Sequence, residues 1–261
     1  MSDKVRDRLS GLAWVLAIFV AIAVVWEAAV KFFGVPLFIL PPIEDVITEL
    51  FSSPALFLRN AAFTVATAMG GFAIAVIVGI LLSVMIVSSR LLERIFMTLL
   101  AVIHSIPKVA LAPLFVIWLG TGFEPKLAIA AMMAVLVVVV DTVAGMRSVD
   151  PEMLNLARVT HASPLAILLK IRFPAALPQI FAAMKAAISL SVVGAIVGEY
   201  VGGQSGLGYV IIVAQGSFDT PRAFAAVLLL SIIATALFYT VVWAESLFIP
   251  WHVSQRPRPA G

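Results

Sequence analysis

The sequence predicts an all-α integral membrane protein of about six transmembrane helices, with a two-helix cytoplasmic loop between spans 4 and 5. Of its 261 residues, 62% are apolar and only 12% are charged, whereas a soluble domain usually has about a quarter charged residues. The apolar segments are long and do not alternate with polar residues, which excludes an outer-membrane barrel. There is no cysteine, so a disulfide-stabilised secreted scaffold is excluded too.

Six segments are long enough to span a bilayer, which takes roughly 20 mostly apolar residues. They are residues 9–26, 60–89, 95–123, 127–146, 182–201 and 223–244. The first segment follows a basic N-terminus but lacks a convincing small-residue cleavage site. We therefore expect an uncleaved signal anchor.

The placement of lysine and arginine predicts that both termini are cytoplasmic, in a multi-pass protein of the inner membrane. In that orientation the inner segments hold twelve basic residues and the outer segments hold four, while Lys108 falls within the third span. We expect cytoplasmic tails at residues 1–10 and 250–261 around a single transmembrane domain at 11–249. The net charge of +3 is small, and we expect the lipid bilayer, not nucleic acid, to surround the chain.

Two loops are long enough to carry structure. The outer loop, about residues 31–60, contains Pro41-Pro42 and then acidic residues, which predicts a short amphipathic helix over 43–51. The inner loop, about residues 147–178, predicts two short helices joined by a turn, with Asp150 and Ser163 as their N-caps. A plain connection needs only a few residues, so the surplus suggests a docking surface. The alternative is an amphipathic helix that lies on the membrane surface.

Several motifs, in the same order along the chain, resemble those of permease subunits of bacterial ABC importers. The segment DPEMLNLAR at 150–158, then Ala162-Ser163 and FPAALP at 173–178, is similar to the EAA loop of that family. Four further motifs resemble those of the branch that imports nitrate, sulfonates and taurine. They are SIPKVALAP at 105–113, WLGTG at 118–122, DTVAGMRSVD at 141–150 and GEYVGGQSGLGY at 198–209. The resemblance extends from about Trp26 to Trp251.

The inner loop departs from the family pattern at two places. The family's loop begins Glu-Ala-Ala, whereas Asn155, Leu156 and Ala157 occupy those positions here. His161 stands where the family has a glycine six residues after that Glu. Glycine adopts a positive φ freely, and histidine enters that region at some cost. The detailed shape of this turn is therefore open at this point.

The resemblance implies a complex of several subunits. Two permease copies, expected to be a homodimer, would form one translocation path, and a periplasmic or lipid-anchored solute-binding protein would deliver the solute. Two copies of a cytoplasmic ABC ATPase would bind ATP and Mg²⁺, and each would bind the inner loop of one permease copy. The coupling residues would be Glu152, Leu154, Asn155, Leu156, Ala157, Arg158, His161, Ala162 and Ser163.

The chain contains no G-x-x-x-x-G-K-[ST] phosphate loop, and the Gly-rich run at 202–208 lacks the lysine. We therefore expect no cofactor and no enzymatic activity in this chain. His104 and His161 have no metal-ligand spacing, so no metal site is expected. The solute is expected to be a small anion such as a sulfonate, taurine or nitrate, with an aromatic acid or a vitamin precursor also open.

Two further groups of residues have alternative roles. Lys108 and Glu199 could line the translocation path, or could snorkel to head groups, pair with another charge or cap a helix. Gly194, Gly198, Gly202 and Gly206 allow close helix approach, either within one subunit or across a dimer interface. The competing functions are an ion-coupled secondary transporter working alone and a membrane scaffold.

Overall fold

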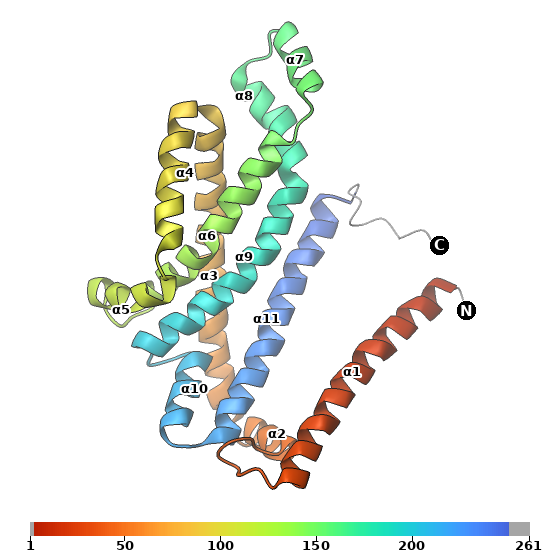
Figure 1. Ribbon diagram of the computed structural model, residues 1–261, viewed down its shortest axis with the longest axis vertical. Helices are drawn as coiled ribbons and strands as arrows, with labels where there is room; N and C mark the ends of the chain where they lie inside the picture. The colour runs from red at the N-terminus through yellow and green to blue at the C-terminus, as the bar shows by residue number, and fades with distance from the viewer. Residues whose placement is uncertain (1–2, 251–261) are drawn as a thin grey trace. The chain divides into compact units, whose positions relative to one another are not determined.

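The computed structural model describes residues 3–250, and the regular structure in that range is helical (Figure 1). The helices are α1 (Asp3–Phe33), α2 (Ile43–Ser52), α3 (Pro54–Ser88), α4 (Arg90–Ser105), α5 (Lys108–Leu119), α6 (Glu124–Arg147), α7 (Pro151–Val159), α8 (Pro164–Ile167), the π-helical turn η1 (Leu168–Arg172), α9 (Phe173–Gly202), α10 (Leu207–Gly216) and α11 (Thr220–Phe248). Except for residue 250, the expected C-terminal tail lies outside the described residues.

Within the described residues, four helices are long and apolar enough to cross a membrane: α3, α6, the continuous helix from α8 to α9, and α11. The bent pair α4–α5 makes a fifth if it is counted as one span. The first expected span, residues 9–26, falls within the 31-residue helix α1. The all-helical class is confirmed, while six spans stays a prediction.

The third expected span, residues 95–123, is broken. α4 and α5 are bent by 94° at a short break. Pro107 has no N–H to continue the helix, and it holds Ile106 in an extended conformation with φ of −79° and ψ of 128°. The chain turns at Pro107 and accommodates Pro113 inside α5.

The second helix of the inner loop does not end near Pro174 or Pro178, so the prediction of a separate short helix is wrong. α8 continues through η1 into α9, and the whole helix Pro164–Gly202 has 39 residues. The wide π-helical turn ends at Arg172, two residues before Pro174, which stands in the first turn of α9. A π-turn changes the local hydrogen-bond register, so a proline that cannot donate is tolerated there.

One compact unit is formed by the N-terminal residues up to Arg59 together with Val210–Leu229. Trp26 Nε1 donates to the Pro41 carbonyl at 2.9 Å, and Arg222 pairs with Glu49 of α2 at 2.7 Å. The predicted amphipathic helix after Pro41-Pro42 is confirmed as α2. The outer loop is shorter than expected, because α1 extends to Phe33 and α3 begins at Pro54.

The second unit, Asn60–Tyr209 with the chain from Leu230 onward, is organised around α6 and α9. These helices are antiparallel and approach closely at glycines. A Cβ on Gly194 would lie 2.6 Å from Ala130 Cα, and one on Gly198 would lie 2.8 Å from Lys126 Cα. Small residues permit such backbone contact, so these two glycines pack helices within one subunit.

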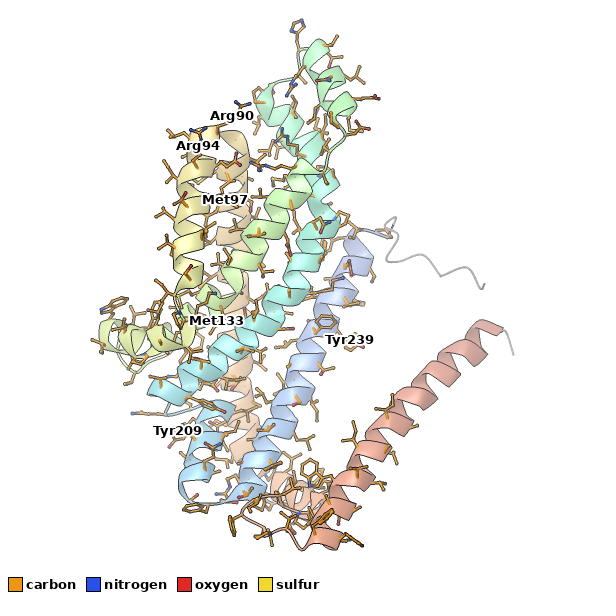
Figure 2. The ribbon with its side chains drawn as sticks, viewed as in Figure 1. Arg90, Arg94, Met97, Met133, Tyr209 and Tyr239 are labelled. Atoms are coloured by element: carbon orange, nitrogen blue, oxygen red, sulfur yellow. The ribbon has the colours of Figure 1, made fainter. Side chains whose placement is uncertain are left out.

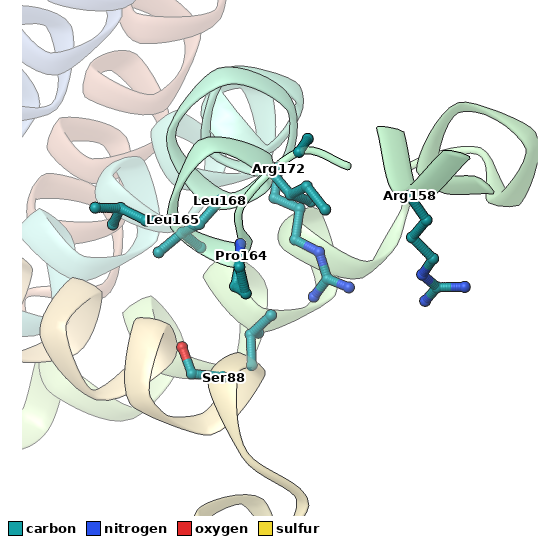
Figure 3. A pocket seen from close by; sticks show the side chains of 9 residues that line it. Ser88, Arg158, Pro164, Leu165, Leu168 and Arg172 are labelled. Carbon is teal, nitrogen blue, oxygen red and sulfur yellow. The ribbon is translucent and has the colours of Figure 1, made fainter. Parts of the chain in front are cut away.

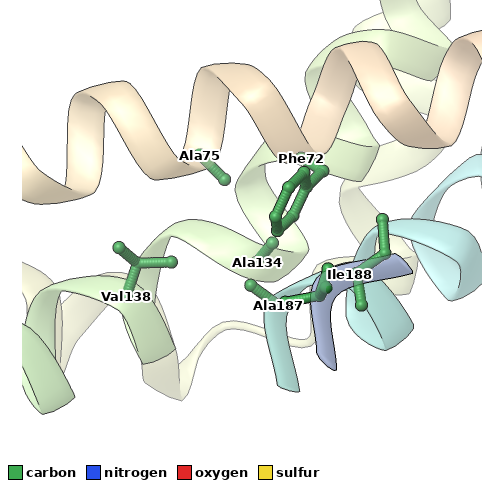
Figure 4. Packing of buried hydrophobic residues seen from close by; sticks show 7 residues of the cluster. Phe72, Ala75, Ala134, Val138, Ala187 and Ile188 are labelled. Atoms are coloured by element: carbon green, nitrogen blue, oxygen red, sulfur yellow. The ribbon is translucent and has the colours of Figure 1, made fainter. Parts of the chain in front are cut away.

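The centre of this second unit is a cluster of apolar side chains from four helices. α3 contributes Phe72 and Ala75, α6 contributes Ala134 and Val138, α9 contributes Ala187 and Ile188, and α11 contributes Val241 (Figure 4). Ala75, Ala134, Val138 and Ala187 have no exposed surface. Alanine at the crossing points lets the helix axes approach, while Phe72 fills the remaining space.

Candidate functional site

α7 begins as the sequence predicts. The Asp150 carboxylate accepts the backbone N–H of Glu152 at 2.8 Å, and Pro151 occupies the first helical position. Glu152 places a negative charge near the positive end of the helix dipole. The helix therefore starts at a fixed residue, which sets the register of every side chain along it.

α7 ends in a Schellman motif that holds His161 in the left-handed region. The Ala162 N–H donates to the Ala157 carbonyl at 2.9 Å, and the His161 N–H donates to the Arg158 carbonyl at 3.0 Å. The φ of His161 is 55°. His161 thus adopts the positive φ for which glycine is usually selected. The departure from the family pattern changes the side chain at this turn without removing the positive φ.

The second helix also starts at its predicted cap. The Ser163 hydroxyl oxygen accepts the Ala166 N–H at 3.2 Å, and Pro164 follows it at the first helical position. The two caps on either side of the Schellman turn define a hairpin of residues 150–167, which we call the α7–α8 hairpin. It lies at the end of the second unit where α6 ends and α9 begins (Figure 1).

The α7–α8 hairpin exposes large apolar side chains. Leu156 is 65% exposed and Val159 is 76% exposed. A groove of about 400 Å³ beside them is lined by Met153, Thr160, Lys170 and neighbouring residues. A short helix with this much unburied apolar surface is characteristic of a contact site for another protein or for a membrane surface.

The predicted coupling residues divide by exposure. Arg158 donates from Nη1 to Asn155 Oδ1 at 3.2 Å, so these two exposed side chains form one polar patch. Ala157 is buried in the turn and supports the hairpin from inside, while Leu154 and Ala162 are half-buried. The exposed members are Glu152, Asn155, Leu156, Arg158, His161 and Ser163.

The far end of α9 carries a buried carboxylate. Glu199 is 0% exposed. One of its oxygens accepts the Thr64 hydroxyl at 2.8 Å, and the other accepts the Gly208 N–H at 2.8 Å. The expectation that Glu199 snorkels to the surface is wrong, because these donors hold it inside. It caps the start of α10, which is one of the alternative roles expected for it. α10 itself was not predicted from the sequence.

Two polar residues of α3 complete this arrangement, which we call the Glu199 cluster (Asn60, Thr64 and Glu199). Asn60 Oδ1 accepts the Gly206 N–H at 2.8 Å, and Thr64 Oγ1 accepts the Leu207 N–H at 2.9 Å. Gly206 has φ of 106°, and a Cβ there would collide with the Glu199 carboxylate. The cluster thereby fixes the Gly-rich turn against α3 and α9.

Lys126 is buried beside this cluster, although the sequence analysis counted it as an outer-loop charge. It is 2% exposed, and its Nζ donates to the carbonyls of Thr121 at 3.0 Å and Gly122 at 2.6 Å. The sequence does contain one signal for this polar site. It is the pair of polar residues Asn60 and Thr64, which stand four residues apart in an apolar segment.

The remaining predicted residues lie apart from the α7–α8 hairpin. Lys108 is the first residue of α5, directly after the break, and is half-buried. Gly202 faces Val116 of α5, where a Cβ would lie 2.7 Å from a Val116 methyl carbon. The role of Lys108 and Glu199 in a path stays a prediction.

Solved chains of ABC transporters share this fold. A chain of the methionine ABC transporter MetNI in an inward-facing conformation has the same fold, with a TM-score of 0.65 and 18% identity over 75% of this chain and 97% of that one. A chain of an amino acid ABC transporter gives a TM-score of 0.61 at 20% identity, over 76% of this chain and 95% of that one.

The chain belongs to the family described as binding-protein-dependent transport system inner membrane component, whose model matches residues 75–251. The riboflavin transport system permease protein of Chloroflexus aurantiacus is 34% identical over 88% of this chain and 87% of its own length. The formylaminopyrimidine transport permease protein of Halalkalibacterium halodurans is 30% identical over 91% and 95%. The putative aliphatic sulfonates transport permease protein of Bacillus subtilis is 27% identical over 95% and 91%. The resemblance to binding-protein-dependent ABC permeases is confirmed.

Proposed function

We propose that this ABC importer permease forms a translocation path with a second copy of itself and is driven by a separate ATPase subunit that binds the α7–α8 hairpin. The observation that carries the proposal is the capped hairpin with exposed Leu156 and Val159. α7 is joined through one tight turn to the 39-residue helix that ends at Gly202. A push on α7 would therefore be transmitted along a span as a rigid-body movement.

The proposal requires a particular orientation. The hairpin faces the cytoplasm, both termini are cytoplasmic, and the membrane is the inner membrane. The excess of basic residues on that side of the chain supports this arrangement. ATP and Mg²⁺ are bound by the ATPase, and a solute-binding protein delivers the solute from the other side. Lys108 and Glu199 are the charged candidates along the path.

For the solute, we favour a small nitrogen heteroaromatic compound of the vitamin or vitamin-precursor class. The two relatives named above with at least 30% identity are named for riboflavin and formylaminopyrimidine. Relatives named for sulfonates and nitrate are 26–28% identical. The sulfonate or nitrate class is therefore the second candidate, and uptake of each labelled compound into cells expressing the complete importer distinguishes them.

The proposed function is tested with the double substitution Leu156→Asp and Arg158→Asp, which replaces an exposed apolar side chain and a positive charge on the hairpin by negative charges. The chain is co-expressed with a candidate ABC ATPase from the same organism and purified through a tag on the permease. We expect the ATPase to be lost from the purified complex while the permease stays in the membrane. The matched control is Phe51→Asp with Arg59→Asp. It also replaces an exposed apolar residue and an exposed arginine by aspartate, at positions far from the hairpin in the sequence. ATPase recovery that survives the hairpin substitution would refute the proposal.

A further inference from the structure

A second cavity lies on the other side of the α7–α8 hairpin, against the end of α3. Its volume is about 480 Å³, and its lining includes Val87, Ser88, Arg158, Pro164, Leu168 and Arg172 (Figure 3). The lining residues come from α3, α7, α8 and η1. The cavity is therefore a junction between a membrane span and the hairpin.

Two guanidinium groups line this cavity. Figure 3 shows the Arg158 and Arg172 side chains extending toward the same side of the hairpin. Among the side chains that the structure describes, neither arginine forms an ion pair with a carboxylate, and the hydrogen-bond partner of Arg158 is the uncharged Asn155. Arginine recognises phosphate through paired N–H donors. The charge of the cavity thus suits a phosphate group.

The rest of the lining is mainly apolar, and the cavity lies at the Ser88 end of the apolar helix α3. α3 has 35 residues, which corresponds to about 50 Å of helix, against a hydrocarbon layer about 30 Å thick. α3 is therefore longer than the hydrocarbon layer, and we expect its end at Ser88 to lie among the head groups. Exposed Arg90 and Arg94 at the start of α4 add positive charge at the same end of α3 (Figure 2). A phosphate joined to apolar chains satisfies both parts of this lining better than a free phosphate ion does.

We propose that this cavity binds the phosphate head group of an anionic phospholipid such as phosphatidylglycerol, with Arg172 and Arg158 as the phosphate-binding residues. Basic pockets beside membrane spans commonly bind such head groups. The lipid's phosphate would tie the Ala162–Pro164 turn to the end of α3. The binding itself does not depend on the proposed function, whereas its consequence for the position of α7 rests on it.

The test uses the full chain in detergent, titrated with phosphatidylglycerol or phosphatidylcholine and analysed by native mass spectrometry. We expect preferential binding of phosphatidylglycerol, and about tenfold weaker binding after Arg172→Gln because a charged phosphate contact is lost. The control Arg94→Gln removes the same charge outside the cavity and should change binding by at most about twofold. Thermal unfolding of each variant shows that it is folded.

Equal binding of phosphatidylcholine, or unchanged phosphatidylglycerol binding by Arg172→Gln, would overturn the proposal. Displacement of the lipid by millimolar inorganic phosphate would overturn the assignment to a lipid in favour of a free anion. Arg158 is left unchanged because it also belongs to the proposed ATPase contact. The titration contains no ATPase, so its failure leaves the proposed function intact. Conversely, an unsubstituted permease that failed to bind an ATPase would still be expected to bind the lipid.

Discussion

Replacing Gly194 by alanine tests the helix contact on which the second unit is built. The new Cβ would lie 2.6 Å from Ala130 Cα and 3.0 Å from the Ile129 carbonyl oxygen, where ordinary contacts begin at 3.4 Å. The backbones would have to separate by several tenths of an ångström. Overpacking of this kind costs about 1–3 kcal/mol. At about 2–4 °C per kcal/mol for a chain of this size, the Tm falls by about 2–12 °C.

The assay is thermal unfolding of the purified protein in detergent, followed by size-exclusion chromatography of the heated samples. The matched control is Gly216→Ala, since Gly216 is also helical and a Cβ there meets nothing within 4 Å. Both variants gain helix propensity, so the difference between their Tm values isolates the steric term. Equal Tm values for the two variants would refute direct backbone contact between α6 and α9.

Two further substitutions test the hairpin turn and the Glu199 cluster. His161→Gly should keep ATPase binding and raise the stability slightly. His161→Val should weaken both ATPase binding and stability, because a β-branched residue resists positive φ by about 1–2 kcal/mol. ATPase co-purification and the Tm measure these effects, and equal behaviour of the two variants would contradict the positive φ at residue 161. Thr64→Val should lower the Tm through a loss of about 1–3 kcal/mol, because it leaves the buried Glu199 oxygen and Leu207 N–H unsatisfied. Thr67→Val is the control, since the Thr67 hydroxyl donates to its own helix at Phe63, and an equal loss there would argue against the cluster.

The features that the sequence predicted correctly are those set by local chemistry. Asp150 and Ser163 were predicted as caps because their side chains precede prolines at helix starts, and the structure uses both. The bend near Pro107 follows from the missing N–H of proline. Hydropathy located the spans that became α3, α6, α9 and α11.

The features that the sequence did not reveal depend on contacts between distant segments. Lys126 is buried because carbonyls of two turns converge on its ammonium group, and no local pattern places Gly202 beside Thr121. Glu199 is internal because Thr64, 135 residues away, donates to it. The continuation of α8 into α9 depends on a π-turn, which has no simple sequence signature.

The measurement that tests the account most directly is site-specific cross-linking of the permease to its ATPase. The chain has no cysteine, so Leu156→Cys introduces a unique thiol on exposed α7, and Phe51→Cys introduces an equally exposed thiol on α2. Each variant is co-expressed with the ATPase and treated in native membranes with a photoactivatable thiol reagent. We expect an adduct of permease and ATPase from residue 156 and none from residue 51. The proposed ATPase contact would be contradicted by an adduct from residue 51 alone. It would also be contradicted if residue 156 gave no adduct in a complex that still hydrolyses ATP and transports solute.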